Sequence, residues 1–340
     1  MRKLLNTLYI TTPEAYLAKD GLNVVVSVNK EELFRIPIMN IEGIVTFGYM
    51  GASPGLMKLC MDNGVSLVFM SPQGHFIGRI QGTTKGNVLL RKQQYHMSED
   101  ENIALHLSKL FVAGKIFNSR NILRRFIRDN GMDEKVEHAA KQLNWIRESA
   151  MNADCMDILR GEEGHAANVY FGVFDHLILH QKTDFSFSGR SRRPPKDEVN
   201  AMLSFVYTLI ANDMAAALES VGLDPYVGFM HTLRPGRTSL ALDMMEELRA
   251  YLGDRLVLSM INRKQVTKKD FIRQGDESVL MTDGCRKELI STWQKRKKET
   301  IEHPYLKENI PIGLLPYVQA KLLSRFLRND LDDYPVFLMR

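Results

Sequence analysis

The chain has 340 residues, of which 44% are hydrophobic and 25% are charged. This composition is ordinary for a globular protein of one large or two ordinary domains, and it excludes a largely disordered chain. The 45 lysines and arginines exceed the 40 aspartates and glutamates, so the formal net charge is +5. A mildly positive charge favours an anionic partner but does not identify one.

The cysteines and the apolar segments indicate the compartment. Cys60, Cys155 and Cys285 are odd in number and widely spaced, and no two of them form a CxxC pair. They therefore support neither a disulfide framework nor a zinc knuckle. The first residues carry charges without the apolar core of a signal peptide, and no stretch approaches about 18 uninterrupted apolar residues. We expect a cytoplasmic protein without a membrane-spanning segment.

Residues 1–80 have the pattern of a small β domain. Short β-branched apolar runs, such as 24–26 and 44–45, are separated by turn sequences such as Asn63-Gly64. Ser53 followed by Pro54 predicts one short helix that begins there, because proline is favoured in the first helical turn. The segment 81–87 contains several glycines and threonines, and we interpret it as a hinge.

From Val88 onward the apolar residues recur at helical spacing, for example at Ala167, Tyr170, Phe174 and Leu177. We therefore predict that residues 88–340 form a helical domain. The predicted fold class is α+β, with a small β-sandwich-like domain followed by a larger all-α domain.

Four residues in the second half of the chain have the chemistry of a divalent-metal site. Glu163 lies in a Gly-Glu-Glu-Gly sequence, His231 follows Gly-Phe-Met, and Asp243 and Glu246 stand three residues apart on one face of a predicted helix. Two carboxylates with one imidazole suit Mn²⁺ or Mg²⁺. The surrounding arginines make a phosphodiester a natural substrate, so the pattern points to nucleic-acid chemistry.

Each of these residues also has a purely structural interpretation. Asp243 and Glu246 could form a solvated acidic face near a helix amino terminus, where the helix dipole favours carboxylates. Glu163 could be an exposed residue beside a helix packing contact, and His231 could be a structural histidine. Spacing alone does not choose among these interpretations.

Basic residues form three groups that could bind DNA phosphates. Arginine presents a planar fork of donors that matches phosphate oxygens, although charged runs are often only solvated surface. The candidate DNA-binding residues are Arg190, Arg192, Arg193 and Lys196 in one loop, Arg234 and Arg237 after the histidine, and Lys268 and Lys269 further along.

Together these motifs resemble the CRISPR-associated spacer-acquisition integrase family, in its type I-C-like form, over essentially the whole chain. The most specific stretches are GEEGHAA followed by YF at 161–171, RRPPKD followed by NA and LS at 192–204, GFMH at 228–231, and SLALDMMEELR at 239–249. Several ordered motifs at family-like spacing are hard to obtain by chance.

The resemblance implies a fold and a ligand set. The family has an amino-terminal β domain that mediates homodimerisation and a helical catalytic domain. In the family the metal is held by residues that match Glu163, His231 and Glu246, and Asp243 would lie beside the metal or serve as an alternate ligand. Many relatives have aspartate where this chain has Glu246, which is longer by one methylene group.

The resemblance also implies a reaction and partners. The 3′-hydroxyl of a short foreign DNA attacks a phosphodiester at the edge of a CRISPR repeat, with Mn²⁺ or Mg²⁺ as cofactor. Two joinings on opposite strands require more than one active site. The family supplies them by bridging two homodimers with a small ferredoxin-like partner protein, and type I-C systems add a nuclease that trims the incoming DNA.

Two other functions use the same residues. A stand-alone metal-dependent nuclease would share every ligand and differ only in transferring the phosphodiester to water. A non-catalytic DNA-binding scaffold would use the acidic and imidazole groups only to pair helices, and its binding would not depend on metal.

Overall fold

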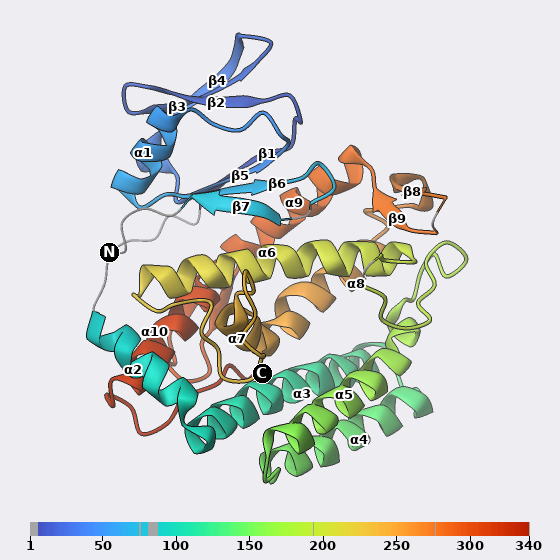
Figure 1. The fold of residues 1–340 in the computed structure, drawn as a ribbon. Coiled ribbons are helices and arrows are strands. Elements are labelled where there is room, and N and C mark those ends of the chain that lie inside the picture. Colours follow the sequence, from blue (N-terminus) through green and yellow to red (C-terminus); the bar gives the residue numbers. More distant parts are fainter. Residues whose placement is uncertain (1–5, 75, 81–87, 193, 276, 340) are drawn as a thin grey trace. The chain divides into compact units, whose positions relative to one another are not determined.

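The computed structural model describes residues 6–74, 76–80, 88–192, 194–275 and 277–339. The chain forms two compact units (Figure 1). The first consists of Met1–Lys85 and Asp283–Glu299, and the second of Gly86–Thr282 and Thr300–Arg340. The hinge that we predicted at 81–87 lies outside the described residues.

The first unit contains two sheets. The four-stranded sheet has the order β1-β5-β6-β7, in which β1, β5 and β6 are parallel and β7 is antiparallel to β6. The other sheet is an antiparallel meander of β2, β3 and β4. The strands are β1 (Thr7–Ile10), β2 (Tyr16–Asp20), β3 (Asn23–Val28), β4 (Glu31–Pro37), β5 (Gly43–Phe47), β6 (Ser66–Met70) and β7 (Phe76–Ile80).

Helix α1 (Pro54–Asn63) starts and stops where its sequence predicts. The Ser53 Oγ accepts a hydrogen bond from the Leu56 backbone N–H at 3.2 Å. Pro54 has no backbone N–H, so it leaves no unbonded donor in the first turn. Gly64 ends the helix with φ of 68°, a left-handed conformation that glycine adopts without steric cost. Leu56 and Cys60 are buried in the core of this unit.

The first unit also includes helix α9 (Asp283–Lys298), which comes much later in the chain. The Gln294 Nε2 donates a hydrogen bond to the Thr7 carbonyl oxygen at 3.0 Å. Our division into 1–80 and 88–340 assigned this segment to the second domain, and the structure corrects that assignment. Helical periodicity identifies α9 as a helix but does not indicate which unit it joins.

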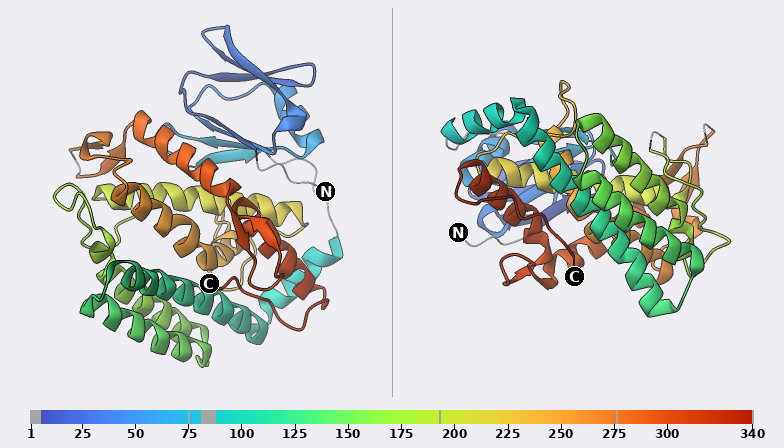
Figure 2. Two further views of the ribbon diagram at one scale, coloured as in Figure 1. Left: turned by 180° about the vertical axis from the view of Figure 1, so that it is seen from behind. Right: turned by 90° about the horizontal axis from the view of Figure 1, so that it is seen from below.

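The second unit is mostly helical. Helices α3, α4 and α5 lie side by side (Figures 1 and 2). The helices are α2 (Val88–Glu99), α3 (Glu101–Asn130), α4 (Glu134–Met151), α5 (Met156–Gly172), α6 (Glu198–Ser220), α7 (Ser239–Arg249), α8 (Arg255–Asn262) and α10 (Leu315–Leu327). A strand-rich region followed by a helical one confirms the predicted α+β fold class.

We had predicted an all-α second domain, but the second unit also contains short strands. Two antiparallel pairs of three-residue strands lie in it, β8 (Phe271–Arg273) with β9 (Val279–Met281) and β10 (Thr300–Glu302) with β11 (Asn309–Pro311). Such short strands show too few alternations for a sequence pattern to reveal them.

Helix α6 is long and apolar enough to cross a membrane by length and composition alone. In this structure 61% of its most apolar 18-residue window is buried inside the protein. Core helices of water-soluble proteins have the same properties, so this helix by itself is weak evidence for a membrane span.

The carboxyl-terminal tail, residues 334–339, docks on α3 and α7 rather than extending into solvent. The buried Asn118 of α3 donates to the Phe337 carbonyl at 2.8 Å and accepts from the Met339 backbone N–H at 2.7 Å. The same amide donates to the Glu247 carbonyl of α7 at 2.6 Å. One asparagine therefore ties together the tail and two helices that carry site residues.

The tail and helix α10 both contact the fully buried carboxylate of Glu247. It accepts hydrogen bonds from the Tyr334 hydroxyl at 2.5 Å, from the Gln319 side chain at 3.1 Å, and from the backbone N–H of Phe337. Burial raises the pKa of Glu247 to about 7, although the three hydrogen bonds favour the ionised form. The group therefore titrates near neutrality in the native protein.

We expect the free energy of unfolding to fall as the pH rises from 5 to 8 because of Glu247. Between its ordinary pKa of 4.5 and about 7, the native state keeps a proton that the unfolded state has lost. The loss is on the order of 3 kcal/mol at pH 8. Urea unfolding across this range should show it, and Glu247→Gln, which cannot titrate, should remove it. An equal slope in both proteins would contradict the assignment.

Candidate metal and phosphodiester site

The centre of the candidate site is an ion-pair cluster contributed by three helices. The Lys115 ammonium of α3 contacts the Glu246 Oε2 of α7 at 2.9 Å and also forms an ion pair with the Glu163 Oε1 of α5. The side chains of Lys115 and Glu246 are 10% and 9% exposed, whereas that of Glu163 is 27% exposed. Glu163 therefore forms the solvent-facing side of the cluster.

Arg249 also binds the carboxylate of Glu246. It stands one helical turn after Glu246, and its Nη1 contacts both carboxylate oxygens, at 2.6 and 2.9 Å. Burial alone would raise the pKa of Glu246, but the charges of Arg249 and Lys115 hold it well below its ordinary value. Glu246 is therefore ionised at neutral pH.

The buried carboxylate of Asp243 fixes the position of His231. Its Oδ1 lies 2.6 Å from the imidazole Nδ1 and accepts the His231 backbone N–H at 3.0 Å. Its Oδ2 accepts the backbone N–H groups of Phe229 and Met230. Because a carboxylate only accepts, Nδ1 carries a proton, and in the neutral imidazole Nε2 keeps the lone pair that a metal requires.

Gly228 permits this arrangement by lacking a side chain. A Cβ atom at this position would lie 2.5 Å from the Asp243 Oδ2 and 2.8 Å from the Leu240 backbone nitrogen. The glycine of the Gly-Phe-Met-His motif therefore allows the histidine segment to approach the start of α7 closely.

A network of buried hydroxyl groups lies behind the cluster. The five residues Ala250–Asp254 form a π-helical turn after α7, an irregularity that is frequent at functional sites. Asp254 accepts hydrogen bonds from the hydroxyls of Tyr207, at 2.5 Å, and Tyr170, at 3.0 Å. The Arg249 guanidinium stacks 4.3 Å from the centre of the Tyr207 ring. These contacts hold the arginine in place.

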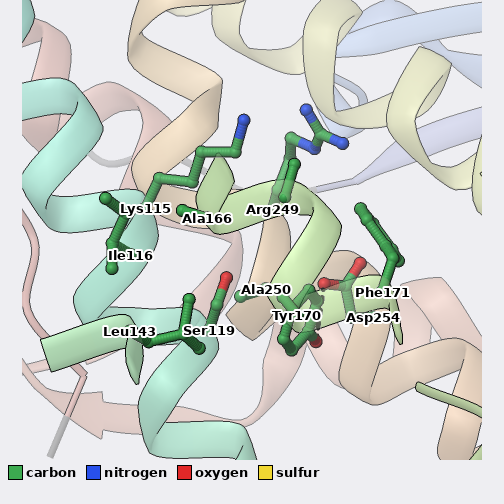
Figure 3. Close-up of a pocket in the computed structure, with 11 residues that line it drawn as sticks. Lys115, Ile116, Ser119, Leu143, Ala166, Tyr170, Phe171, Arg249, Ala250 and Asp254 are labelled. Carbon is green, nitrogen blue, oxygen red and sulfur yellow. Dashed lines mark hydrogen bonds between the residues drawn. The ribbon is translucent and has the colours of Figure 1, made fainter. Parts of the chain in front are cut away.

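A cavity of about 20 Å³ lies between this network and the cluster. Lys115, Arg249, Tyr170 and Asp254 are among the residues that line it (Figure 3). This volume accommodates about one water molecule. The cavity is thus a space beside the charged groups and is too small to receive a nucleotide.

The predicted basic residues do not all present their charges in the same way. The half-buried Arg190 guanidinium donates hydrogen bonds to the Asn200 Oδ1 at 2.5 Å and to the Ser204 Oγ at 3.1 Å. Lys196 is exposed and lies 3.9 Å from Glu277. Arg237 is half-buried, and Arg193 lies outside the described residues. Besides Lys196, the exposed side chains are those of Arg192, Arg234, Lys268 and Lys269.

Sequence reasoning singled out Glu163, His231, Asp243 and Glu246 but assigned no role to Lys115 or Arg249. Arg249 had a local signal, because it follows Glu246 by one helical turn. Lys115 had none, because it lies 48 residues from Glu163 and its role depends on how the helices pack.

The donor chemistry of the cluster fits the Mn²⁺ or Mg²⁺ that the resemblance implies. Glu163 and Glu246 already converge on one cation, and the His231 imidazole is oriented by a carboxylate as metal-binding histidines are. The three candidate ligands are not, however, grouped as closely as in a formed metal site. Among the residues that the structure describes, no group of three or more His, Cys, Asp and Glu side chains is arranged to hold a metal.

Comparison with known proteins gives the family. Residues 8–295 match the family described as CRISPR associated protein Cas1. CRISPR-associated endonuclease Cas1 1 of Chlorobaculum tepidum is 48% identical over the full length of both chains. Cas1 2 of Rhodospirillum rubrum is 48% identical over 98% of both. A fusion of exonuclease Cas4 and endonuclease Cas1 from Geobacter sulfurreducens is 35% identical over 98% of this chain and 60% of the fusion.

Solved structures share the fold. A Cas1 protein of Thermotoga maritima superposes with a TM-score of 0.83 at 20% identity, over 98% of this chain and all of that one. A casposase bound to an integration product has a TM-score of 0.83 at 20% identity, over 97% and 93% of the chains. A chain of a Cas6-RT-Cas1–Cas2 complex has 0.84 at 21%, over 98% and 36%. The chain belongs to the Cas1 family, as its motifs predicted.

Proposed function

We propose that this chain is a metal-dependent DNA integrase of CRISPR adaptation with associated endonuclease activity. It would join the 3′-hydroxyl ends of short foreign DNA to a CRISPR repeat by transesterification. The observation that carries the proposal is that Glu163 and Glu246, from two helices, both contact the Lys115 ammonium. The His231 imidazole is oriented by Asp243, which lies one helical turn before Glu246 on α7. The relatives at 48% identity are named endonucleases, which supports phosphodiester chemistry.

Each residue has a distinct task in this proposal. Glu163, Glu246 and the Nε2 of His231 would hold Mn²⁺ or Mg²⁺, which when bound polarises a phosphoryl oxygen and stabilises the charge that develops on it. Asp243 keeps the imidazole in the tautomer with Nε2 unprotonated. Arg249 balances the charge of Glu246 within the protein, where an uncompensated carboxylate would be costly.

The joining step conserves the number of phosphodiester bonds. The 3′-oxygen of the foreign strand forms a bond to a repeat phosphorus, the bond from that phosphorus to the repeat 3′-oxygen breaks, and the proton of the attacking hydroxyl leaves for solvent or the departing oxygen. The exposed Arg192, Arg234, Lys268 and Lys269 are the residues best placed to bind DNA phosphates. Arg190 would support its loop from within.

The proposed partners follow from the two joinings and from the relatives. A homodimer, bridged to a second one by a small ferredoxin-like protein, would bring two sites to the two strands of a repeat. A Cas1 protein with a superposable fold is part of a complex with Cas2, and a relative is fused to an exonuclease, which supports a trimming nuclease as a further partner. The type I-C assignment and the cytoplasmic location remain predictions.

Stand-alone nuclease activity is the second candidate, because the names of the relatives specify endonuclease activity. It would use the same ligands with water as the nucleophile. A non-catalytic scaffold is the least supported, since three separate helices would then converge carboxylates and cations in one place without chemical use.

A strand-joining assay tests the proposal. Purified protein, with its small partner, would be incubated with a short duplex bearing free 3′-hydroxyls and a repeat-containing plasmid, in Mn²⁺ or in EDTA. We expect covalent joining in Mn²⁺ only, reduced by at least about 10³-fold in Glu163→Gln. Glu162→Gln is the matched control, because the neighbouring Glu162 bonds to Ser149 instead. Cleavage without joining would establish the nuclease, and DNA binding without either would establish the scaffold.

A further inference from the structure

Lys115 stands in an unusual place for a buried lysine. Its ammonium is shared by two carboxylates, Glu163 and Glu246, that come from different helices. Both are residues that the proposed function assigns to a metal. The lysine thus occupies the point at which the two anionic groups converge, and it supplies there the positive charge that two adjacent carboxylates need.

The two cations of the cluster are held very differently. Arg249 contacts both oxygens of Glu246 and stacks on the Tyr207 ring at 4.3 Å, so its planar group is fixed on two sides. Lys115 is a point charge at the end of a flexible four-carbon chain. Of these two cations, the lysine is therefore the one held by fewer directional contacts.

An ammonium and a divalent cation cannot share the same oxygens of Glu163 and Glu246, because their charges repel strongly at contact distance. A cavity of about 20 Å³ lies beside Lys115, and the Asp254 carboxylate lines the same cavity. Figure 3 shows the Lys115 side chain extending toward the side on which Arg249 lies. The flexible lysine side chain allows the ammonium to leave by rotation about its own bonds.

We propose that Lys115 is a built-in competitor for the metal, whose ammonium must leave Glu163 and Glu246 before a divalent ion binds them. This inference rests on the proposed function and adds a residue that sets metal affinity. The lysine keeps the carboxylates neutralised and in place when no metal is bound, and it lowers the apparent affinity for the ion. Binding is then an exchange of one cation for another.

Metal binding to the full chain without DNA tests the exchange. In isothermal titration with Mn²⁺, we expect Lys115→Met to lower the dissociation constant about tenfold, within the usual range for coupling between two ligands. In EDTA the same variant should melt roughly 5 °C below the unsubstituted protein, because the carboxylates then repel each other. Saturating Mn²⁺ should restore most of that loss while raising the melting temperature of the unsubstituted protein much less.

Two variants make the outcome decisive. Lys141→Met removes a lysine from an exposed pair with Glu137, at 3.4 Å, and should change neither measurement. Glu163→Gln should abolish the Mn²⁺ heat in both backgrounds. Equal or weaker Mn²⁺ binding by Lys115→Met, with binding still sensitive to Glu163→Gln, would overturn the exchange and leave the metal site intact. Binding insensitive to Glu163→Gln would remove the metal site and both proposals with it.

Discussion

Glu246→Gln should abolish strand joining and also weaken the fold. The substitution removes the negative charge that pairs with both Arg249 and Lys115. The buried Arg249 guanidinium then loses its ion pair with Glu246. Breaking a buried pair by removing one partner costs about 3–5 kcal/mol. Loss of a metal ligand should reduce joining by at least about 10³-fold, since each 1.4 kcal/mol of lost transition-state stabilisation is about tenfold in rate.

The measurement combines urea unfolding with the joining assay at equal amounts of folded protein. Glu198→Gln is the matched control, because Glu198 is also a buried glutamate of the second unit paired with an arginine, Arg273 at 3.2 Å. It should lose stability but keep joining. Full joining by folded Glu246→Gln would refute the ligand role, and unchanged unfolding would show that the arginine finds another partner.

Asp243→Asn should disturb the position of His231 without altering a proposed ligand. The carboxylate accepts three backbone N–H groups and the imidazole Nδ1, and its side chain is fully buried. An amide in its place turns one acceptor oxygen into a donor that faces other donors. We expect a loss of about 3–5 kcal/mol in the free energy of unfolding, because buried donors lose a charged acceptor. Joining by the folded fraction should fall about 10²-fold.

Asp133→Asn is a close control for this prediction. Asp133 also contacts an imidazole, His176 at 2.8 Å, and caps helix α4, but its side chain is 30% exposed. Loss of such a cap costs about 1 kcal/mol. Excess Mn²⁺ should partly restore joining in Asp243→Asn, because a weakened ligand set requires more metal. Equal effects of the two substitutions on joining would indicate that Asp243 acts only through stability.

The positions of Asp243 and Glu246 illustrate how far local patterns reach. Their three-residue spacing correctly predicted a helix, α7, that carries both residues. The structure shows that the two side chains have different partners, since Asp243 bonds to the histidine segment and Glu246 to two cations. Spacing placed the carboxylates on one element, but their partners come from other parts of the chain.

The basic loop that contains Arg190 and Arg192 is a second case in which local sequence does not determine the role of a residue. Arg190 and Arg192 flank Ser191, and nothing in the sequence around them distinguishes their roles. In the structure, Arg190 is half-buried and bonds to Asn200 and Ser204, whereas Arg192 is exposed. Whether an arginine supports a loop or faces DNA depends on which side of the loop packs on α6, and charge composition carries no information about that.

The sequence by itself determined the order of a strand-rich region and a helical one, the ends of helices such as α1, and the motifs that identify the family. These are properties of neighbouring residues, because periodicity, capping and turn chemistry act over a few positions. The tertiary structure decided the membership of α9 in the first unit, the docking of the tail on Asn118, and the bridge of Lys115 to two glutamates. Each of these depends on contacts between segments far apart in the chain, whose geometry is set by packing and not by local sequence.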